Sequence, residues 1–259
     1  MRGARIDRVD QRRPDLRRPF PRDFVSRLTG QTIRSIARRG KYLLVDLSSD
    51  ETLLVHLGMS GDFRAERIET PRRGEEPVID AHDHVVFQLS SGVVVTFNDP
   101  RRFGVMDLIR GGRISEHAAL RALGPEPLDA AFDAAVLARA CAGKRAALKV
   151  VLLDQRVVAG LGNIYASEAL HHARLSPRRR ASTIATPSGA PRETAVRLAA
   201  GIKAVLLDAV ARQERAYRSS RFRVYERDGE RCPRRGCSGS IRRITQAGRS
   251  TYFCPTCQH

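Results

Sequence analysis

The chain has 259 residues, 42% of them hydrophobic, which is enough to bury a substantial core and typical of two domains. Its 46 Lys+Arg residues outnumber 28 Asp+Glu residues, and the formal net charge of +18 favours polyanionic partners. No apolar run approaches the ~20 residues that span a bilayer, and nothing after Met1 resembles a signal peptide. These features exclude a membrane partner and predict a soluble, cytoplasmic protein.

The first half of the chain is rich in strand patterns. Short alternating or β-branched runs occur at residues 4–10, 42–47, 53–57, 84–89 and 93–97, with turn residues between them. Residues 66–80 are polar and predict a surface loop. Five or more short strands predict an antiparallel β-sandwich over residues 1–124.

The pattern changes to helices after the L-G-P-E-P segment at 123–127. Helical spacing covers residues 131–142, 146–153, 164–172 and 193–212, with an exposed connection expected at 177–191. Cys141 stands alone on one helical stretch and is expected to be a small buried apolar residue. Residues 125–221 therefore form a predicted helical domain.

A glycine-containing turn joins the second and third of these helices. It contains Gly160 and Gly162, and Asn163 is in position to cap the helix that follows. Glycines permit close backbone approach, and the free N–H groups at a helix start bind anions such as a DNA phosphate. An ordinary helical hairpin with a glycine C-cap has the same spacing, so this turn alone does not decide between the two.

The strongest local signal is a set of four cysteines near the end of the chain. They form two close pairs, C-P-R-R-G-C and C-P-T-C, separated by sixteen residues. This spacing is typical of a structural zinc site with four thiolate ligands. Two disulfides are the alternative, which the lack of a secretory segment disfavours. The predicted ligands are Cys232, Cys237, Cys254 and Cys257.

The sixteen residues between the cysteine pairs alternate apolar and polar side chains around a Gly-Arg turn. They predict a β-hairpin, within a segment 222–259, from which Arg242, Arg243 and Arg249 project. From Arg212 to the end, twelve arginines face four acidic residues, a local net charge of 12 − 4 = +8. Guanidinium groups bind phosphate well, so nucleic acid is the favoured partner.

Several separated motifs resemble those of bacterial formamidopyrimidine-DNA glycosylase. They are H-L-G-M-S-G, D-P-R-R-F-G, G-L-G-N-I-Y-A-S-E and the cysteine-rich tail with Q-A-G-R-S-T-Y-F-C. The resemblance implies an α+β fold, in which an antiparallel β-sandwich precedes a helix–two-turn–helix domain and a zinc-bound hairpin. It also implies a monomeric bacterial DNA-repair enzyme with one structural zinc ion. Such an enzyme associates with the nucleoid when it acts on double-stranded DNA with damaged bases or abasic sites.

The implied activity is base excision followed by strand cleavage. The family excises oxidised purines such as 8-oxoguanine and formamidopyrimidines from a flipped-out position, then cleaves the abasic site by β,δ-elimination. By motif, Lys41 in R-R-G-K-Y-L-L matches the residue assigned to proton donation in β-elimination. Arg249 matches the arginine that grips the lesion phosphates and assists δ-elimination. Without the resemblance, Lys41 would be a solvated lysine at a strand start.

Four residues match the family's gap-filling and strand-contacting positions. Met59 would fill the gap that the everted nucleotide leaves, and Phe103 would wedge into the base stack. Arg101 would contact the orphaned base and Arg102 a phosphate. On their own, Met59 and Phe103 would more often be core residues.

Further residues match DNA-contacting positions of the family. They are His82 in H-D-H, Lys144 in C-A-G-K-R, and Lys149 and Asn163 near the lesion strand. A lone histidine such as His82 is otherwise more often a structural residue.

The sequence departs from the family in three places. The family begins P-E-L-P-E, with the proline amine as nucleophile and the glutamate as acid/base. Here the chain begins M-R-G-A-R-I, which resembles the family's first strand, and we expect the natural start to lie upstream. The connection at 216–225 is shorter than the family loop that carries P-G-Y-F and covers the flipped purine. The first cysteine pair is C-x4-C where the family usually has C-x2-C.

Two alternatives accompany this interpretation. A non-catalytic binder of damaged or abasic DNA would need neither the proline nor the glutamate. Specificity of the endonuclease VIII type, for oxidised pyrimidines, is disfavoured by the pairing of H-L-G-M-S-G with D-P-R-R-F-G.

Overall fold

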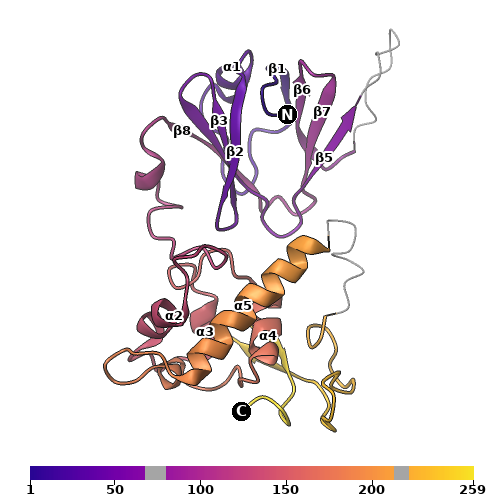
Figure 1. Cartoon of the computed structure of the whole chain (residues 1–259). Coiled ribbons are helices and arrows are strands. Elements are labelled where there is room, and N and C mark those ends of the chain that lie inside the picture. Colours follow the sequence, from indigo (N-terminus) through magenta and orange to yellow (C-terminus); the bar gives the residue numbers. More distant parts are fainter. Residues whose placement is uncertain (68–79, 213–221) are drawn as a thin grey trace. The chain divides into compact units, whose positions relative to one another are not determined.

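The computed structural model describes residues 1–67, 80–212 and 222–259 (Figure 1). These residues form two compact units, Met1–Arg121 and Ala122–His259. None of the described helices has the length and apolarity that crossing a membrane requires. Most of the expected polar loop at 66–80, and residues 216–221 of the shortened connection, lie outside the described residues.

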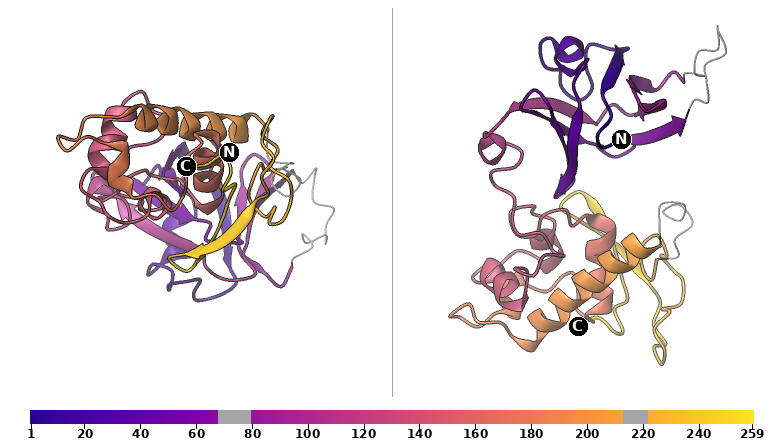
Figure 2. Two further views of the ribbon diagram at one scale, coloured as in Figure 1. Left: turned by 90° about the horizontal axis from the view of Figure 1, so that it is seen from below. Right: turned by 45° about the horizontal axis from the view of Figure 1, so that its top comes forward.

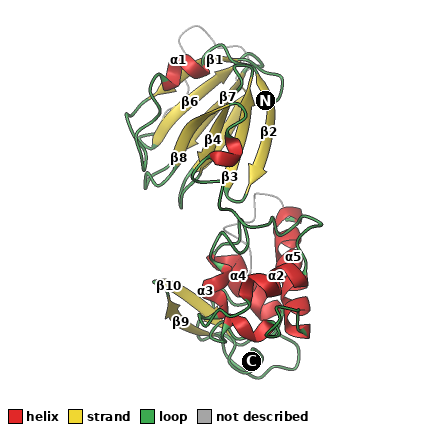
Figure 3. Cartoon of the chain, turned by 90° about the vertical axis from the view of Figure 1, so that its left-hand side faces the viewer, coloured by secondary structure: helices red, strands yellow, loops and turns green. Residues whose placement is uncertain are grey.

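Within its described residues, the first unit contains two antiparallel sheets of four strands each (Figures 1 and 3). In spatial order, the first sheet consists of β1 (Ile6–Gln11), β6 (Asp83–Leu89), β7 (Val93–Asn98) and β5 (Asp62–Arg67). The second consists of β2 (Ile33–Arg39), β3 (Tyr42–Leu47), β4 (Glu51–His56) and β8 (Val105–Arg110), again in spatial order.

One apolar core joins the two sheets. Its members alternate along each strand, because successive side chains of a strand point to opposite faces. The short helix α1 (Phe24–Leu28) adds Phe24 and Leu28, one helical turn apart, to the same core. The strand contributions include Val85, Phe87 and Leu89 from β6, Val95 and Phe97 from β7, Leu53 and Val55 from β4, and Met106 and Leu108 from β8. The predicted α+β fold with antiparallel sheets is confirmed.

The sequence did not reveal every element of this unit. The strands β2 and β5 were missed because both lie at sheet edges and are largely exposed, so their apolar alternation is weak. The strand β8 and helix α1 were also not predicted. The loop expected from residue 66 begins later, because Glu66 and Arg67 pair with Val94 and Val93 as the last residues of β5.

The described part of the second unit is built around four α-helices. They are α2 (Ala134–Cys141), α3 (Leu148–Leu152), α4 (Asn163–His172) and α5 (Glu193–Ala211). The first is shorter than predicted because Asp133 caps it, its carboxylate accepting from Val136 N at 2.7 Å. Cys141 is fully buried in the core of this unit, as predicted, among side chains that include Leu137, Leu148 and Leu198.

The long helix α5 crosses α4, as Figure 2 shows. At the crossing, a Cβ on Gly201 would lie 3.1 Å from the Ala169 carbonyl oxygen, so the absence of a side chain lets the two helices approach closely.

The predicted hairpin consists of β9 (Arg242–Gln246) and β10 (Arg249–Phe253), paired antiparallel. Its turn residues are Ala247 and Gly248, with φ of 47° and 72°. Two successive positive φ values suit a two-residue hairpin turn. The turn therefore lies one residue earlier than the predicted Gly-Arg turn, and Arg249 is the first strand residue, paired with Gln246.

Candidate nucleic-acid interface and metal centre

Two loops of the first unit expose apolar side chains beside a guanidinium group. Met59 follows β4 and is 72% exposed, while Phe103 precedes β8 and is 39% exposed. Neither is a core residue. The guanidinium carbon of Arg101 lies 4.7 Å from the centre of the Phe103 ring, a cation–π arrangement. Exposed apolar groups of this size beside a cation are suited to contact with a partner.

The fully buried carboxylate of Asp99 ties these two loops together. Ser60 Oγ donates to Asp99 Oδ1 at 2.6 Å, and Gly104 N donates to Asp99 Oδ2 at 2.7 Å. Gly58 has φ of 72°, and a Cβ there would lie 2.5 Å from the carbonyl carbon of Phe103. Met59 and Phe103 therefore sit on loops in close backbone contact. Sequence reasoning missed Asp99 and Ser60, although an Asp before Pro is a common turn signal.

Lys41, Arg102 and His82 are also exposed in the first unit. Burial, and then the positive charges of Lys41 and Arg17, lower the pKa of His56, which packs against the Tyr42 ring at 4.9 Å between centres. Lys41 and Arg17 are therefore close enough to His56 for their positive charges to favour the uncharged form of its ring. The His82 carbonyl accepts from Asp99 N at 3.0 Å, which fixes His82 beside the loop that carries Arg101.

A buried lysine is the centre of the second unit's polar network. Lys149, on α3, is 1% exposed, and its Nζ donates to Asn163 Oδ1 at 2.7 Å and to Thr251 Oγ1 at 2.7 Å. It also donates to the Ser250 carbonyl at 3.1 Å. The network joins α3, the start of α4 and the first residues of β10.

Asn163 does not cap α4 as predicted. Gly162 is the N-cap, and the Asn163 side chain instead accepts from Lys149 and donates from Nδ2 to the Ser250 carbonyl at 3.0 Å. The amide is thus used in tertiary contacts. The Tyr225 ring packs edge-on against Tyr252, with 5.1 Å between the ring centres.

Positive charge accumulates at this network. Burial, and then the charge of Arg249, lower the pKa of Lys149 to about 8. At neutral pH most of the lysine is still protonated, and Arg249 is exposed near it. Lys144 is exposed in the loop after α2, and Arg242 and Arg243 are exposed on β9. These groups favour an anionic partner such as a nucleic-acid backbone.

Glu168 on α4 is a further residue that sequence reasoning missed. Its carboxylate is 6% exposed and accepts backbone N–H groups from Arg223 at 2.8 Å, Val224 at 2.9 Å and Tyr225 at 3.0 Å. It therefore fixes the segment that leads into the cysteine-rich hairpin against the helix. A charged residue within an otherwise apolar helical face was the available signal.

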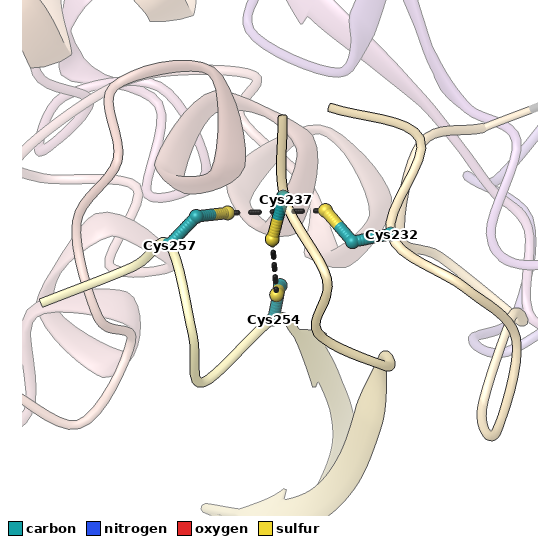
Figure 4. Close-up of side chains that lie close together, drawn as sticks. All are labelled: Cys232, Cys237, Cys254 and Cys257. Atoms are coloured by element: carbon teal, nitrogen blue, oxygen red, sulfur yellow. Dashed lines mark hydrogen bonds between the residues drawn. The ribbon is translucent and has the colours of Figure 1, made fainter. Parts of the chain in front are cut away.

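The four predicted metal ligands lie together, with all Sγ atoms within 4.8 Å of one another. Cys232 and Cys257 have their Sγ atoms 3.8 Å apart, and Cys237 and Cys254 have theirs 3.7 Å apart (Figure 4). Tetrahedral zinc with Zn–S bonds of about 2.3 Å requires sulfurs about 3.8 Å apart. The donor set and its spacing fit one structural zinc ion, as predicted.

Comparison with family models matches nearly the whole chain. Residues 1–106 match the formamidopyrimidine-DNA glycosylase N-terminal domain, and residues 123–220 match the H2TH domain of the same enzymes. Residues 229–259 match a zinc finger found in FPG and IleRS.

Individual proteins are similar over all or nearly all of this chain. A formamidopyrimidine-DNA glycosylase of Rhodopseudomonas palustris (strain HaA2) is 54% identical over 275 residues, covering 100% of this chain and 94% of the relative. The structure of MutM (Fpg) from Thermus thermophilus is 36% identical, with a TM-score of 0.81, covering 100% of this chain and 92% of that one. A Lactococcus lactis enzyme bound to abasic-site DNA is 30% identical, with a TM-score of 0.82 and coverage of 99% and 93%. This chain therefore belongs to the formamidopyrimidine-DNA glycosylase family.

Proposed function

We propose that the protein is a base-excision repair glycosylase that removes oxidised purines, including 8-oxoguanine and formamidopyrimidines, and cleaves the resulting abasic site. The observation that carries this proposal is the pair of loops tied by Asp99, which expose Met59 and the stacked Arg101 and Phe103. An enzyme that acts on a base must take it out of the stack, and these groups are suited to fill the space it leaves.

The comparisons support this substrate class. The Lactococcus lactis relative was solved with abasic-site DNA, and a MutM relative, 30% identical, was solved with DNA containing carbocyclic 8-oxo-G. Double-stranded DNA with a damaged base or abasic site is thus the proposed partner, bound by a monomer in the bacterial cytoplasm. The proposed modules are a β-sandwich over 1–124, a helix–two-turn–helix domain over 125–221 and a zinc finger over 222–259.

Each candidate interface residue has a proposed role on the DNA. Met59 and Phe103 occupy the gap and the adjacent stack, while Arg101 contacts the orphaned base. Phosphate contacts position the duplex, so the register of the lesion depends on them. Zinc, when bound, fixes the hairpin from which Arg249 and the partners of Lys149 project. The residues proposed to hold the phosphates are Arg102, His82, Lys144 and Arg249. The buried Lys149 and Asn163 are proposed to support the lesion-strand side of this surface, through a positive charge and hydrogen bonds to β10.

The chemistry proposed for the sugar requires an amine nucleophile. A proline amine attacks C1′, the damaged base leaves, and the resulting Schiff base allows loss of the 3′ and then the 5′ phosphate. In the family this amine is the proline of the P-E-L-P-E opening, which residues 1–259 do not contain. Lys41 donates a proton during β-elimination, and Arg249 assists δ-elimination.

The experiment compares two proteins, the printed chain and the same chain preceded by the family's opening segment. Each is incubated with a duplex containing 8-oxoguanine opposite cytosine, with borohydride to trap a Schiff base. We expect base release, a trapped adduct and δ-elimination product from the extended protein alone. If the extended protein binds abasic-site DNA tightly yet releases no base, the non-catalytic alternative is correct. Equal affinity of that protein for damaged and undamaged duplexes would contradict both functions.

A further inference from the structure

A buried histidine lies beside the four predicted zinc ligands and is not one of them. His171, in the last turn of α4, is fully buried, and its Nε2 lies 3.5 Å from Cys232 Sγ. This separation suits an N–H···S hydrogen bond. The adjacent His172 is exposed, so the two neighbouring histidines differ in their surroundings.

The surroundings of the His171 ring select one tautomer. A zinc-bound thiolate can only accept a hydrogen bond, so the contact with Cys232 requires the proton on Nε2. Within the described residues, Nδ1 of His171 is buried and has no hydrogen-bond partner. With the proton on Nε2, the unpaired Nδ1 is an acceptor. With the proton on Nδ1, a buried N–H group would be unpaired, and the lone pair of Nε2 would point at the thiolate. Buried N–H groups without a partner are rarer in proteins than buried acceptors without one, which favours the first tautomer.

An arginine from the zinc-binding segment is bound to the backbone of the same histidine. Arg234 lies in the loop between Cys232 and Cys237. Its Nη2 donates to the His171 carbonyl oxygen. His171 therefore contacts the first cysteine pair twice, through its ring at Cys232 and through its carbonyl at Arg234.

We propose that His171 is a positioning residue that donates a hydrogen bond to the zinc-bound thiolate of Cys232, that Arg234 holds the backbone of His171 in place, and that the two residues slow the loss of zinc. A zinc ion with four thiolates carries a net charge of about −2, which is costly to bury without donors around the sulfurs. The N–H donor of His171, directed at the Cys232 thiolate, disperses part of that charge. The attachment of Cys232 and Arg234 to His171 also ties the metal site to α4, the helix whose first residue, Asn163, contacts β10.

The first test reads the hydrogen bond directly in the full chain with the metal bound. Histidine nitrogens are labelled with 15N, and zinc is exchanged for 113Cd. We expect His171 to be the Nε2–H tautomer and to show a scalar coupling between this proton and the cadmium. A His171 signal with the proton on Nδ1, or with Nε2 protonated but uncoupled from cadmium, would overturn the role of His171.

The second test measures zinc transfer to a chromogenic chelator. We expect His171→Phe to accelerate release by about tenfold or more, the size of effect typical of residues that hydrogen-bond metal ligands, and Arg234→Gln to accelerate it as well. His172→Phe and Arg235→Gln are the matched controls and should release zinc like the parent. His171→Gln, which can restore an N–H donor, should recover part of the loss. Release from His171→Phe and Arg234→Gln at the parent rate would refute the proposal, whatever the DNA-repair activity.

Discussion

The ammonium group of Lys149 donates a hydrogen bond to Thr251 Oγ1 at 2.7 Å, across 102 residues of sequence. This contact joins α3 to the first residues of β10 in the zinc-bound hairpin. Because the lysine is 1% exposed, its charge is balanced by the oxygens of Asn163, Ser250 and Thr251 rather than by water. The cationic centre of the second unit therefore depends on the hairpin being folded.

Replacing Lys149 with Met is expected to weaken binding to a duplex that contains a tetrahydrofuran abasic site. The variant removes one positive charge beside the proposed phosphate-binding residues, so the slope of log affinity against log salt should fall, by about one at most. Fluorescence anisotropy at several salt concentrations measures this slope. Lys203→Met removes the same charge from α5 and should leave the affinity for the duplex unchanged. An unaltered slope for Lys149→Met would contradict a role of this charge in DNA binding.

The low pKa of Lys149 predicts a pH dependence of DNA affinity. The pKa falls from an ordinary value of 10.5 to about 8, so the free protein loses this charge as pH rises through 8. Affinity should therefore decrease between pH 7 and 9 more steeply in the parent than in Lys149→Met. The same pKa shift has the opposite effect on folding stability. The Lys149 ammonium of the unfolded chain keeps its proton to a higher pH than that of the folded protein. Stability should then rise with pH above 8, relative to the variant, in urea titrations.

Asp99→Asn is expected to destabilise the first unit. The carboxylate accepts from Ser60 and Gly104, and an amide would turn an N–H₂ group toward one of these donors. The free energy of unfolding should fall by about 1–3 kcal/mol, which urea denaturation measures. Asp50→Asn, at an exposed position, is the control. The loops that Asp99 holds together carry Met59 and Phe103. Asp99→Asn should therefore also reduce the ratio of the affinity for abasic-site DNA to the affinity for intact DNA.

Glu168→Ala should loosen the segment that leads into the zinc finger. Three backbone N–H groups, those of Arg223, Val224 and Tyr225, would lose their acceptor, at a cost of at least about 2 kcal/mol. Hydrogen exchange of these three amides should accelerate strongly. Glu193→Ala, at the exposed start of α5, should leave them protected. Unchanged protection in Glu168→Ala would mean that another group holds the segment.

Removal of zinc is expected to abolish DNA binding before it unfolds the helices. The hairpin is held by the cysteines, whereas the helices share an apolar core of their own. Chelation should therefore retain most of the helical circular-dichroism signal while binding to the abasic duplex is lost, and added zinc should restore it. Simultaneous loss of the helical signal would show that the helices depend on the metal.

The sequence by itself determined the order of the modules and the metal ligands. Both follow from local patterns, which can be recognised from neighbouring residues alone. These patterns are the alternating side chains of the strands, the helical spacing after residue 124 and the two cysteine pairs. The motifs also singled out Lys149, Asn163, Arg249, Met59 and Phe103. What spacing could not decide was whether Met59 and Phe103 are core or surface residues, because burial depends on what the rest of the fold covers.

Only the tertiary structure decided how those residues are held. Asn163 stands where a helix cap is expected, yet its amide contacts Lys149 and Ser250, since the hairpin supplies partners from the far end of the chain. No local sequence motif marks a role for Asp99, Glu168 or His171. Their roles depend on hydrogen-bond donors, and for His171 on the Cys232 sulfur, that folding brings close to them. Hydrogen bonds between distant segments leave no periodic signal in the sequence. The residues that hold the site in place could therefore be identified only from the folded structure.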